Sequence, residues 1–549
     1  MQTSFSKRIL TLLIISYAFF FFGNSLLSFT DPDETFYALT AKEMMAHGDW
    51  LTPYIFNEPQ FEKPILTYWL LKAAFNAWGI TPFAARFFPA LFATLGVIAV
   101  YLFGLMGFKD ERKAFLSALI LATSALFAGM GKTVFTDMIF AVFILYALLS
   151  FFWGYCFPRR RTLSIILFYV FAALATLTKG PLGLLIPEVV IILFLLYRRQ
   201  LNLLNNSWLA VGLAIYLLMT LPWYLYMFNT YGNTFIHEFF YNDHWRRLLE
   251  AEHRSNDSWY FYMATMVGAI FPWSLFLVAA TVNLYKRLRH AASLMDHLML
   301  GWVLVVFIIF QSAHSKLSSY ILPLFPALAL LTGDFIDEQL SSLKGQRRLK
   351  WFACINFLLL TLLGVFLLVG HNVYKHYMPS LMPGYFISGA LIALSGIGLT
   401  LAFQDKIQGA LYVMSMSLLP ILLVLFMIKW DIEGYVSSYE ASLYIPHKES
   451  TPMTVLVSKN NARGITFYTG QHVAVINSGS MPYFSPHPIS ILDTEDKITD
   501  VLNHQKLTFG VVRRSAYEDL MKRHTDHFRV TLLKRSGIYY IVKIEPLMS

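Results

Sequence analysis

The stretch from residue 31 to residue 69 is the densest group of acidic, aromatic and proline residues in the apolar part of the chain. Asp33 follows the first membrane-length apolar run by a few residues, where a carboxylate could act as a general base on a hydroxyl. Glu62 and Lys63 form an adjacent acid–base pair, and Pro64 restricts the backbone of Lys63 to extended geometry. A lysine held in this way beside a bilayer could bind the phosphate of a lipid head group.

Each of these residues also has a purely structural interpretation. Asp31 or Asp33 could cap a helix that begins near Glu34. Glu62 and Lys63 could form an ordinary exposed ion pair. A charged side chain at membrane depth is energetically costly, and such side chains occur mostly where they bind a substrate or an ion. The position beside the bilayer therefore favours a functional role.

Further polar side chains stand near the ends of apolar runs. Asp137 lies about three residues inside such a run, where a carboxylate needs a partner, and Lys132 is the local candidate. Lys316 and Tyr320 open another run, where a snorkelling cation is the alternative interpretation. Four lysines would then share one outer region, which suits an anionic lipid phosphate: Lys63, Lys132, Lys179 and Lys316.

His244 lies in a second polar stretch between apolar runs. One histidine and one glutamate, here His244 and Glu62, could share a divalent cation with other oxygen ligands. The spacing is not itself a metal motif, and most single histidines are not ligands, so a histidine without metal is the alternative.

The bulk composition places all these residues in a membrane protein. Of 549 residues, 56% are hydrophobic and 14% are charged, with a positive mean hydropathy. A soluble chain of this length would need far more polar surface. The net charge of +10 is therefore interpreted through membrane topology, and we expect no nucleic-acid partner. The two cysteines, Cys156 and Cys354, indicate no disulfide framework.

Apolar segments of spanning length predict a mainly α, polytopic protein of about thirteen transmembrane helices over residues 1–430. Lysine and arginine recur in alternate loops, which predicts a cytoplasmic N-terminus. The acidic stretches at 31–82 and 229–258 then form two long loops on the periplasmic side. Residues 66–78 and 229–258 each predict an amphipathic helix on the membrane surface.

Residues 431–549 have a different composition. Short β-branched runs alternate with helical patterns, which predicts a small α/β domain with a mixed sheet outside the membrane. An odd number of spans would place this domain on the periplasmic side. It carries no glycine-rich phosphate loop and no nucleophile elbow, so a structural or substrate-gating role is favoured.

An ordered set of motifs resembles the lipid-phosphate-dependent glycosyltransferases, bacterial relatives of the protein O-mannosyltransferases, and among them the aminoarabinose transferases that modify lipid A. The set covers about Ser28 to Leu331 and consists of DPDETFYALTAKEMMAHGDWLTP, FEKPILTYWL, FAARFFPALFA, TKGPLG, FYNDHWRR and SKLSSYILPLFPALALL. The resemblance implies the C-type glycosyltransferase fold of this superfamily. Phe36 departs from the family, which usually has an arginine or similar polar residue after Asp-Glu-Thr.

The resemblance also implies roles for individual residues. Asp33 matches the loop carboxylate at the active centre, and Asp137 matches a second acidic residue of the cavity. Lys63 matches the lysine that binds the carrier phosphate, and Tyr320 matches a tyrosine near that phosphate. Beyond the resemblance, Lys316 is expected to stabilise the departing phosphate together with Lys63 and Tyr320. Glu62 and His244 match a pair that holds a structural divalent metal, zinc in the family.

These features together predict an inner-membrane enzyme that takes a sugar, possibly aminoarabinose, from a polyprenyl-phosphate carrier. The acceptor would be lipid A or a similar glycolipid at the periplasmic face. Two alternatives stay open: an enzyme like the protein O-mannosyltransferases that acts on protein, and a non-catalytic transporter of lipid-linked sugar. Transporters tend to show repeat symmetry, and no internal repeat is visible here.

Overall fold

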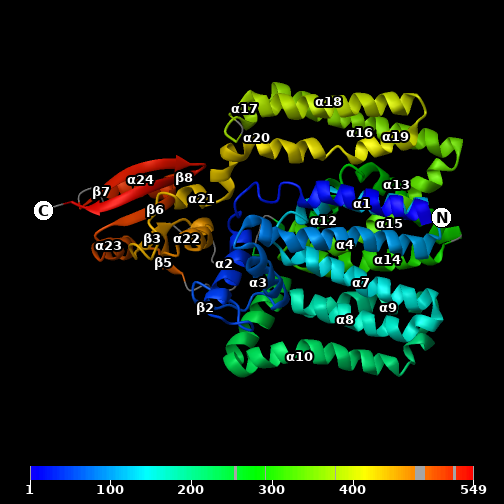
Figure 1. The fold of residues 1–549 in the computed structure, drawn as a ribbon, viewed down its shortest axis with the longest axis horizontal. Helices are drawn as coiled ribbons and strands as arrows, with labels where there is room; N and C mark the ends of the chain where they lie inside the picture. Colours follow the sequence, from blue (N-terminus) through cyan, green and yellow to red (C-terminus); the bar gives the residue numbers. More distant parts are fainter. Residues whose placement is uncertain are drawn as a thin grey trace.

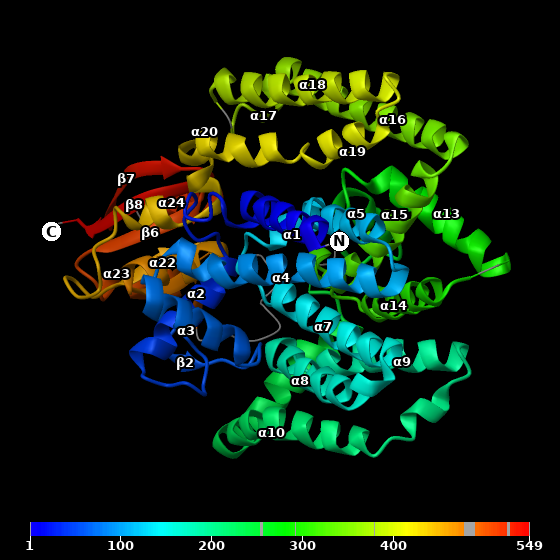
Figure 2. The same cartoon turned by 45° about the vertical axis from the view of Figure 1, so that its right-hand side comes forward.

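The computed structural model describes residues 2–252, 256–290, 292–377, 379–476, 489–523 and 527–547. A layer of long, roughly parallel helices makes up most of the molecule, and a small sheet domain lies at one end of it (Figure 1). The N-terminus lies at the opposite end of this layer (Figure 1). In both views α16, α18 and α20 form one edge of the layer and α10 the other (Figure 2).

The helices of the layer are α1 (Gln2–Ser16), η1 (Tyr17–Phe21), α4 (Pro82–Phe108), α5 (Glu111–Ala122), α6 (Ala125–Met130), α7 (Thr136–Cys156), η2 (Pro158–Arg160), α8 (Arg161–Lys179), α9 (Leu182–Tyr197), η3 (Leu201–Leu204), α10 (Trp208–Phe235), η4 (Ile236–Trp245), α11 (Arg246–Leu249), α12 (Phe261–Ala269), α13 (Ser274–His290), α14 (Leu294–Ser312), η6 (Ser318–Leu324), α15 (Phe325–Leu340), α16 (Leu343–Val369), α17 (His371–Tyr374), α18 (Leu381–Phe403), α19 (Ile407–Ser415) and α20 (Leu419–Val436).

The polytopic helical fold predicted from composition is confirmed, but the count of about thirteen spans is not. Within the described residues, nine helical segments are long and apolar enough to cross a membrane, or ten if α12 and α13 form one span bent by 119°. The difference comes from three other predicted segments. These correspond to α1 with η1, α5 with α6, and the 16-residue α9, which are short or broken.

The segment formed by η6 and α15 lies at the centre of the layer. Its most apolar window is 94% buried, whereas the window of α10 is 22% buried. A helix that is apolar all round belongs in the interior, and one with an exposed apolar face belongs against lipid. Proline at the start of α15, Pro326, is tolerated because the first turn has no partner for its N–H.

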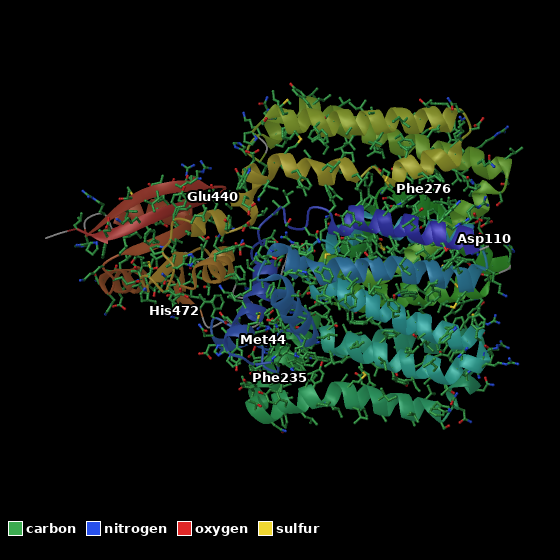
Figure 3. The ribbon with its side chains drawn as sticks, viewed as in Figure 1. Met44, Asp110, Phe235, Phe276, Glu440 and His472 are labelled. Atoms are coloured by element: carbon green, nitrogen blue, oxygen red, sulfur yellow. The ribbon has the colours of Figure 1, made fainter. Side chains whose placement is uncertain are left out.

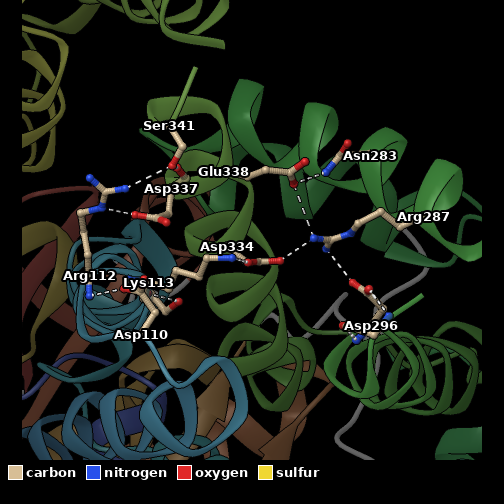
Figure 4. Close-up of polar contacts among 12 residues, drawn as sticks. Asp110, Arg112, Lys113, Asn283, Arg287, Asp296, Asp334, Asp337, Glu338 and Ser341 are labelled. Atoms are coloured by element: carbon tan, nitrogen blue, oxygen red, sulfur yellow. Dashed lines mark hydrogen bonds and ion pairs between the residues drawn. The ribbon is translucent and has the colours of Figure 1, made fainter. Parts of the chain in front are cut away.

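A network of ion pairs joins α5, α13, α14 and α15 at one end of the layer (Figure 4). Asp334 of α15 accepts from Lys113 of α5 at 2.6 Å and from Arg287 of α13 at 2.6 Å. Arg287 also pairs with Asp296 of α14 at 2.6 Å. Figure 3 labels Asp110, the residue that caps the start of α5 and so lies one turn from Lys113, at the end of the layer away from the sheet domain.

Two further groups of elements lie at the other end, next to the sheet domain. The first long loop contains α2 (Asp33–Ala46), a hairpin of β1 (Tyr54–Ile55) and β2 (Glu58–Pro59), and α3 (Leu66–Trp78), so the predicted helix at 66–78 is confirmed. The second is the end of α10 with η4 and α11, where Gly232 (φ 55°) breaks the helix. Met44 of α2 and Phe235 of α10 are labelled at this end in Figure 3.

The polar domain after α20 has a six-stranded mixed sheet of order β5-β4-β3-β6-β8-β7, as its composition predicts. Strands β5, β4, β3 and β6 are parallel, and β8 and β7 are antiparallel to their neighbours. Its elements are α21 (Tyr439–Ser442), β3 (Thr454–Val457), η7 (Lys459–Asn461), α22 (Ala462–Thr469), β4 (His472–Ile476), β5 (Ser490–Leu492), α23 (Glu495–Asn503), β6 (Thr508–Arg513), α24 (Arg514–Arg523), β7 (Phe528–Ser536) and β8 (Tyr539–Pro546). Helix α22 packs against α2 and so joins this domain to the first long loop.

Candidate functional site

A cavity of about 990 Å³ opens where η4 and α11 meet the adjacent ends of α8, α9, α14 and η6. Its walls are largely apolar, with Leu182, Leu185, Phe240 and Phe310 among the lining residues. Its polar side chains include three cations and one hydroxyl: Lys63, Lys179, Arg247 and Tyr320. An apolar chamber with a few convergent polar groups is the usual form of a small-molecule site.

Lys63 enters this cavity from the first long loop and is held by the second. Its Nζ donates to both carboxylate oxygens of Asp243, at 2.9 and 2.8 Å, and to the carbonyl oxygen of Glu62 at 2.9 Å. Asp243 also pairs with Arg247, one helical turn further on, at 3.1 Å. The carboxylate of Asp243 therefore holds two cations close together at the cavity wall.

Tyr320 lies between Arg247 and Lys179. Arg247 Nη1 donates to the Tyr320 hydroxyl at 3.2 Å, and Lys179 Nζ lies 4.2 Å from the centre of the Tyr320 ring. Lys179 also pairs with Asp137 at 2.5 Å. The sequence suggested Lys132 as the partner of Asp137, and this is wrong: Lys132 reaches instead the carbonyl oxygen of Phe22 and, at 3.3 Å, Asn24.

The turn between α8 and α9 has a glycine for a steric reason. Gly180 has a φ of 99°, and a Cβ there would lie 2.4 Å from Nε2 of His244. Only glycine fits, because L side chains avoid this backbone region and because any Cβ would collide with the His244 ring. The close approach packs η4 onto the end of α8 and brings Lys179 beside the residues of the second loop.

Asp33 lies outside the lining of this cavity, at the first residue of α2, and its neighbours are firmly held. Glu34 is fully buried and pairs with Arg86 of α4 at 2.5 Å, and it also accepts from the Val134 amide at 3.0 Å. Burial alone would raise the pKa of Glu34, but the Arg86 guanidinium outweighs it and holds that pKa below its usual value. The turn that carries Asp33 is thereby fixed to the start of α7.

Tyr37 connects Asp33 and Asp137 electrostatically. Burial raises the pKa of the Tyr37 hydroxyl well above its usual value, and the neighbouring Tyr68 hydroxyl and the carboxylates of Asp137 and Asp33 add to this shift. Both predicted acidic residues therefore act on one buried phenol, although Asp33 is exposed and Asp137 is 4% exposed.

Lys316, predicted beside the carrier phosphate, is buried and pairs with Asp257 at 3.2 Å. Its neighbour Ser315 lines the cavity, whereas Lys316 is not among the lining residues. The predicted phosphate contact of Lys316 stays a prediction.

Glu62 and His244 do not make a metal site in the present arrangement. No group of three or more histidine, cysteine, aspartate or glutamate side chains lies close enough to hold an ion among the residues that the structure describes. Nδ1 of His244 lies 2.7 Å from the Phe239 carbonyl oxygen, and its Nε2 faces the Gly180 turn. A zinc ion needs an open nitrogen and about four ligands, which the described residues do not bring together around Glu62 and His244.

Of the four lysines that the sequence places in one outer region, Lys63 and Lys179 line the cavity, whereas two further charged residues of the cavity, Asp243 and Arg247, had no predicted role. Asp243 and Arg247 are four residues apart in the motif DHWRR, a spacing typical of ion pairs on a helix, and that signal was available. The pairing of Asp243 with Lys63 crosses 180 residues, and no local pattern predicts it.

The model of the family described as dolichyl-phosphate-mannose-protein mannosyltransferase matches residues 5–237. A protein of Aquifex aeolicus described as uncharacterized is 30% identical over 63% of this chain and 66% of its own length. The undecaprenyl phosphate-alpha-4-amino-4-deoxy-L-arabinose arabinosyl transferase 2 of Pseudomonas fluorescens is 29% identical over 65% of this chain and 60% of its own. The chain thus aligns with just under two thirds of the length of these relatives.

The fold extends over the whole chain. The crystal structure of ArnT from Cupriavidus metallidurans in the apo state matches with a TM-score of 0.79, 20% identity and 98% coverage of both chains. The same protein bound to undecaprenyl phosphate matches with a TM-score of 0.76 and 19% identity over 97% of both chains. The family model and these relatives are thus similar to the part of the chain that carries the motifs, and the solved structures match the fold of the chain as a whole.

Proposed function

We propose that the protein is a glycosyltransferase that moves a sugar from a polyprenyl-phosphate carrier to lipid A or a similar glycolipid. The observation that carries this proposal is the grouping of Lys63, Lys179, Arg247 and Tyr320 at one wall of an apolar cavity of about 990 Å³. A polyprenyl phosphate has the matching chemistry, because its head is an anion and its tail is hydrocarbon. Names of curated relatives support aminoarabinose as the sugar.

The cations would bind the carrier phosphate and stabilise it as it leaves. Transfer breaks the bond between the anomeric carbon and a phosphate oxygen, and the electron pair stays on that phosphate. The extra negative charge then forms beside Lys63, Lys179 and Arg247, whose positions are set in advance by Asp243 and Asp137. The Tyr320 hydroxyl accepts from Arg247, so its own proton is free to point at a phosphate oxygen.

Asp33 would act on the acceptor. The anomeric carbon forms its new bond to an acceptor oxygen, and when that oxygen belongs to a hydroxyl the proton passes to Asp33. A phosphate acceptor is already anionic, and Asp33 then only positions it. Asp137 would contribute indirectly, because it holds Lys179 at 2.5 Å and acts on Tyr37.

We place the reaction at the periplasmic face of the bacterial inner membrane. This rests on the alternation of basic and acidic loops in the sequence. Lys113 and Arg287 come from the basic stretches that this alternation puts on the cytoplasmic side, and both belong to the ion-pair network (Figure 4). Asp110, at the start of the same helix as Lys113, lies at the end of the layer away from the sheet domain (Figure 3).

Mass spectrometry of lipid A and of membrane proteins, in cells with and without this chain, tests the proposal. We expect a sugar-sized mass increase on lipid A that depends on the chain. Asp33→Ala and Lys63→Ala, assayed in membranes with labelled lipid-linked sugar, should abolish transfer. Normal turnover in folded variants would refute these roles.

The second candidate is transfer to protein. The matching family model carries the description of a protein mannosyltransferase, which is the observation that favours it. Label on membrane proteins with unmodified lipid A would select this candidate. Label on neither acceptor, with carrier-linked sugar still crossing the membrane, would select a transporter.

A further inference from the structure

The turn that carries Asp33 is bound on one side by the membrane helices and on the other by the C-terminal domain. Glu34 reaches Arg86 of α4 and the Val134 amide before α7. Asp31, two residues before Asp33, reaches the opposite way, into the segment that joins α20 to α21.

The contact between Asp31 and the C-terminal domain is dense. One carboxylate oxygen of Asp31 accepts from the Ser438 amide at 2.7 Å and from the Ser438 hydroxyl at 2.5 Å. The other accepts from the Thr35 hydroxyl of α2 at 2.7 Å, and the Asp31 amide donates to the Val436 carbonyl at 2.8 Å. Asn461 donates to the Ser438 hydroxyl at 3.1 Å, which orients that hydroxyl toward Asp31.

Helix α22 of the C-terminal domain also packs against Asp31. A Cβ at Gly464 would lie 2.4 and 2.5 Å from the two Asp31 carboxylate oxygens, so the backbone of α22 touches the carboxylate itself. Arg463 donates to the Pro32 carbonyl at 3.2 Å, and its guanidinium lies 4.7 Å from the centre of the Phe36 ring. Asp31, Pro32, Glu34, Thr35 and Phe36 thus each contact an adjoining element or their own helix.

We infer that the C-terminal domain is part of the catalytic unit, with Ser438 as a positioning residue that fixes the Asp33 turn through Asp31. The inference rests on the proposed function only for the role of Asp33. The amide and the hydroxyl of Ser438 both donate to one oxygen of Asp31, so Ser438 holds the turn by two directional hydrogen bonds in addition to packing. The domain then acts on the reaction without touching a substrate.

The test uses the full chain in nanodiscs and compares Ser438→Ala with Ser442→Ala. Ser442 is a matched control, because its hydroxyl is also buried in this domain but donates to the Tyr439 carbonyl, away from Asp31. We expect turnover in Ser438→Ala to fall by up to about tenfold, as for the loss of one buried hydrogen bond. The Kd for undecaprenyl phosphate should stay unchanged, and Ser438→Thr, which keeps a hydroxyl, should restore turnover.

Hydrogen exchange of the amides of residues 31–36 gives a readout that needs no transfer activity. Faster exchange in Ser438→Ala than in Ser442→Ala supports the inference even if the wild type transfers no sugar to lipid A, an outcome that would refute only the proposed function. Equal exchange and equal turnover in the two variants would overturn the inference. Gly464→Ala, which forces a methyl group against Asp31, should increase exchange further.

Discussion

Replacement of Lys63 by methionine isolates the binding of the carrier phosphate. Methionine keeps most of the side-chain volume and removes the charge. The Lys63 ammonium has three donors, and its three hydrogen bonds go to the two Asp243 oxygens and the Glu62 carbonyl. A phosphate must therefore replace at least one of these bonds rather than add to them.

The expected loss of affinity for the carrier phosphate follows from this exchange of one hydrogen bond for another. A hydrogen bond to a charged group contributes about 1.5–3 kcal/mol, which corresponds to roughly 10- to 150-fold in Kd. Because Lys63 gives up a bond to Asp243 when it binds phosphate, we expect the lower end, about tenfold. Asp243 stays paired with Arg247 at 3.1 Å in the variant, so the fold should survive.

Equilibrium binding of fluorescent undecaprenyl phosphate to protein in nanodiscs measures this loss. Lys350→Met is the matched control, because Lys350 pairs with Asp405 at 2.8 Å and is not among the cavity-lining residues. We expect its Kd to stay within about twofold of the wild type, as for other ion pairs with a solvated partner. Equal weakening in both variants, or no weakening in Lys63→Met, would refute the assignment of the phosphate to this cavity.

Three further predictions concern the loops beside the cavity. Asp33→Asn should abolish transfer while the Kd for undecaprenyl phosphate stays unchanged, and weakened binding would contradict its assignment to the acceptor. Burial raises the pKa of Asp31 from 3.8 to about 7, so the folded protein holds a proton that the unfolded chain releases near pH 4. Stability should therefore fall as the pH rises through about 4 to 7, and melting curves of Asp31→Asn should show a weaker dependence; an identical dependence would refute the assignment. Because Glu62 and His244 make no metal site in this arrangement, we expect elemental analysis of the purified, active chain to find no stoichiometric zinc; about one ion per chain that is lost in His244→Ala would contradict this and restore the site that the resemblance implies.

Apolar run length and charge alternation predict most of the fold. They locate α4, α7, α14, α16 and α18 to within a few residues, because lipid-facing helices need continuous apolar sequence. They overcount spans where a run is interrupted. At Ser124, between α5 and α6, the helix breaks and the next amide donates to the Phe271 carbonyl of another segment, a tertiary contact that no local pattern contains.

The sequence predicted those residues of the candidate site whose charge is energetically costly beside a bilayer. Asp137 and Lys63 stood out because charge is expensive beside a bilayer, and the structure gives each an ionic partner. The identity of those partners was not predictable, since Lys179 and Asp243 are distant in sequence. The family resemblance supplied roles for Tyr320 and His244 that residue chemistry alone left open.

The ion-pair network of Lys113, Arg287, Asp296 and Asp334 has a consequence for how a bulky lipid enters. It fastens four helices at the end of the layer far from the cavity, through pairs of about 2.6 Å that are costly to separate. A bundle fastened at one end separates more readily at the other. The opening that admits the carrier is therefore expected at the cavity end, as a sideways parting of helices that leaves the far end closed.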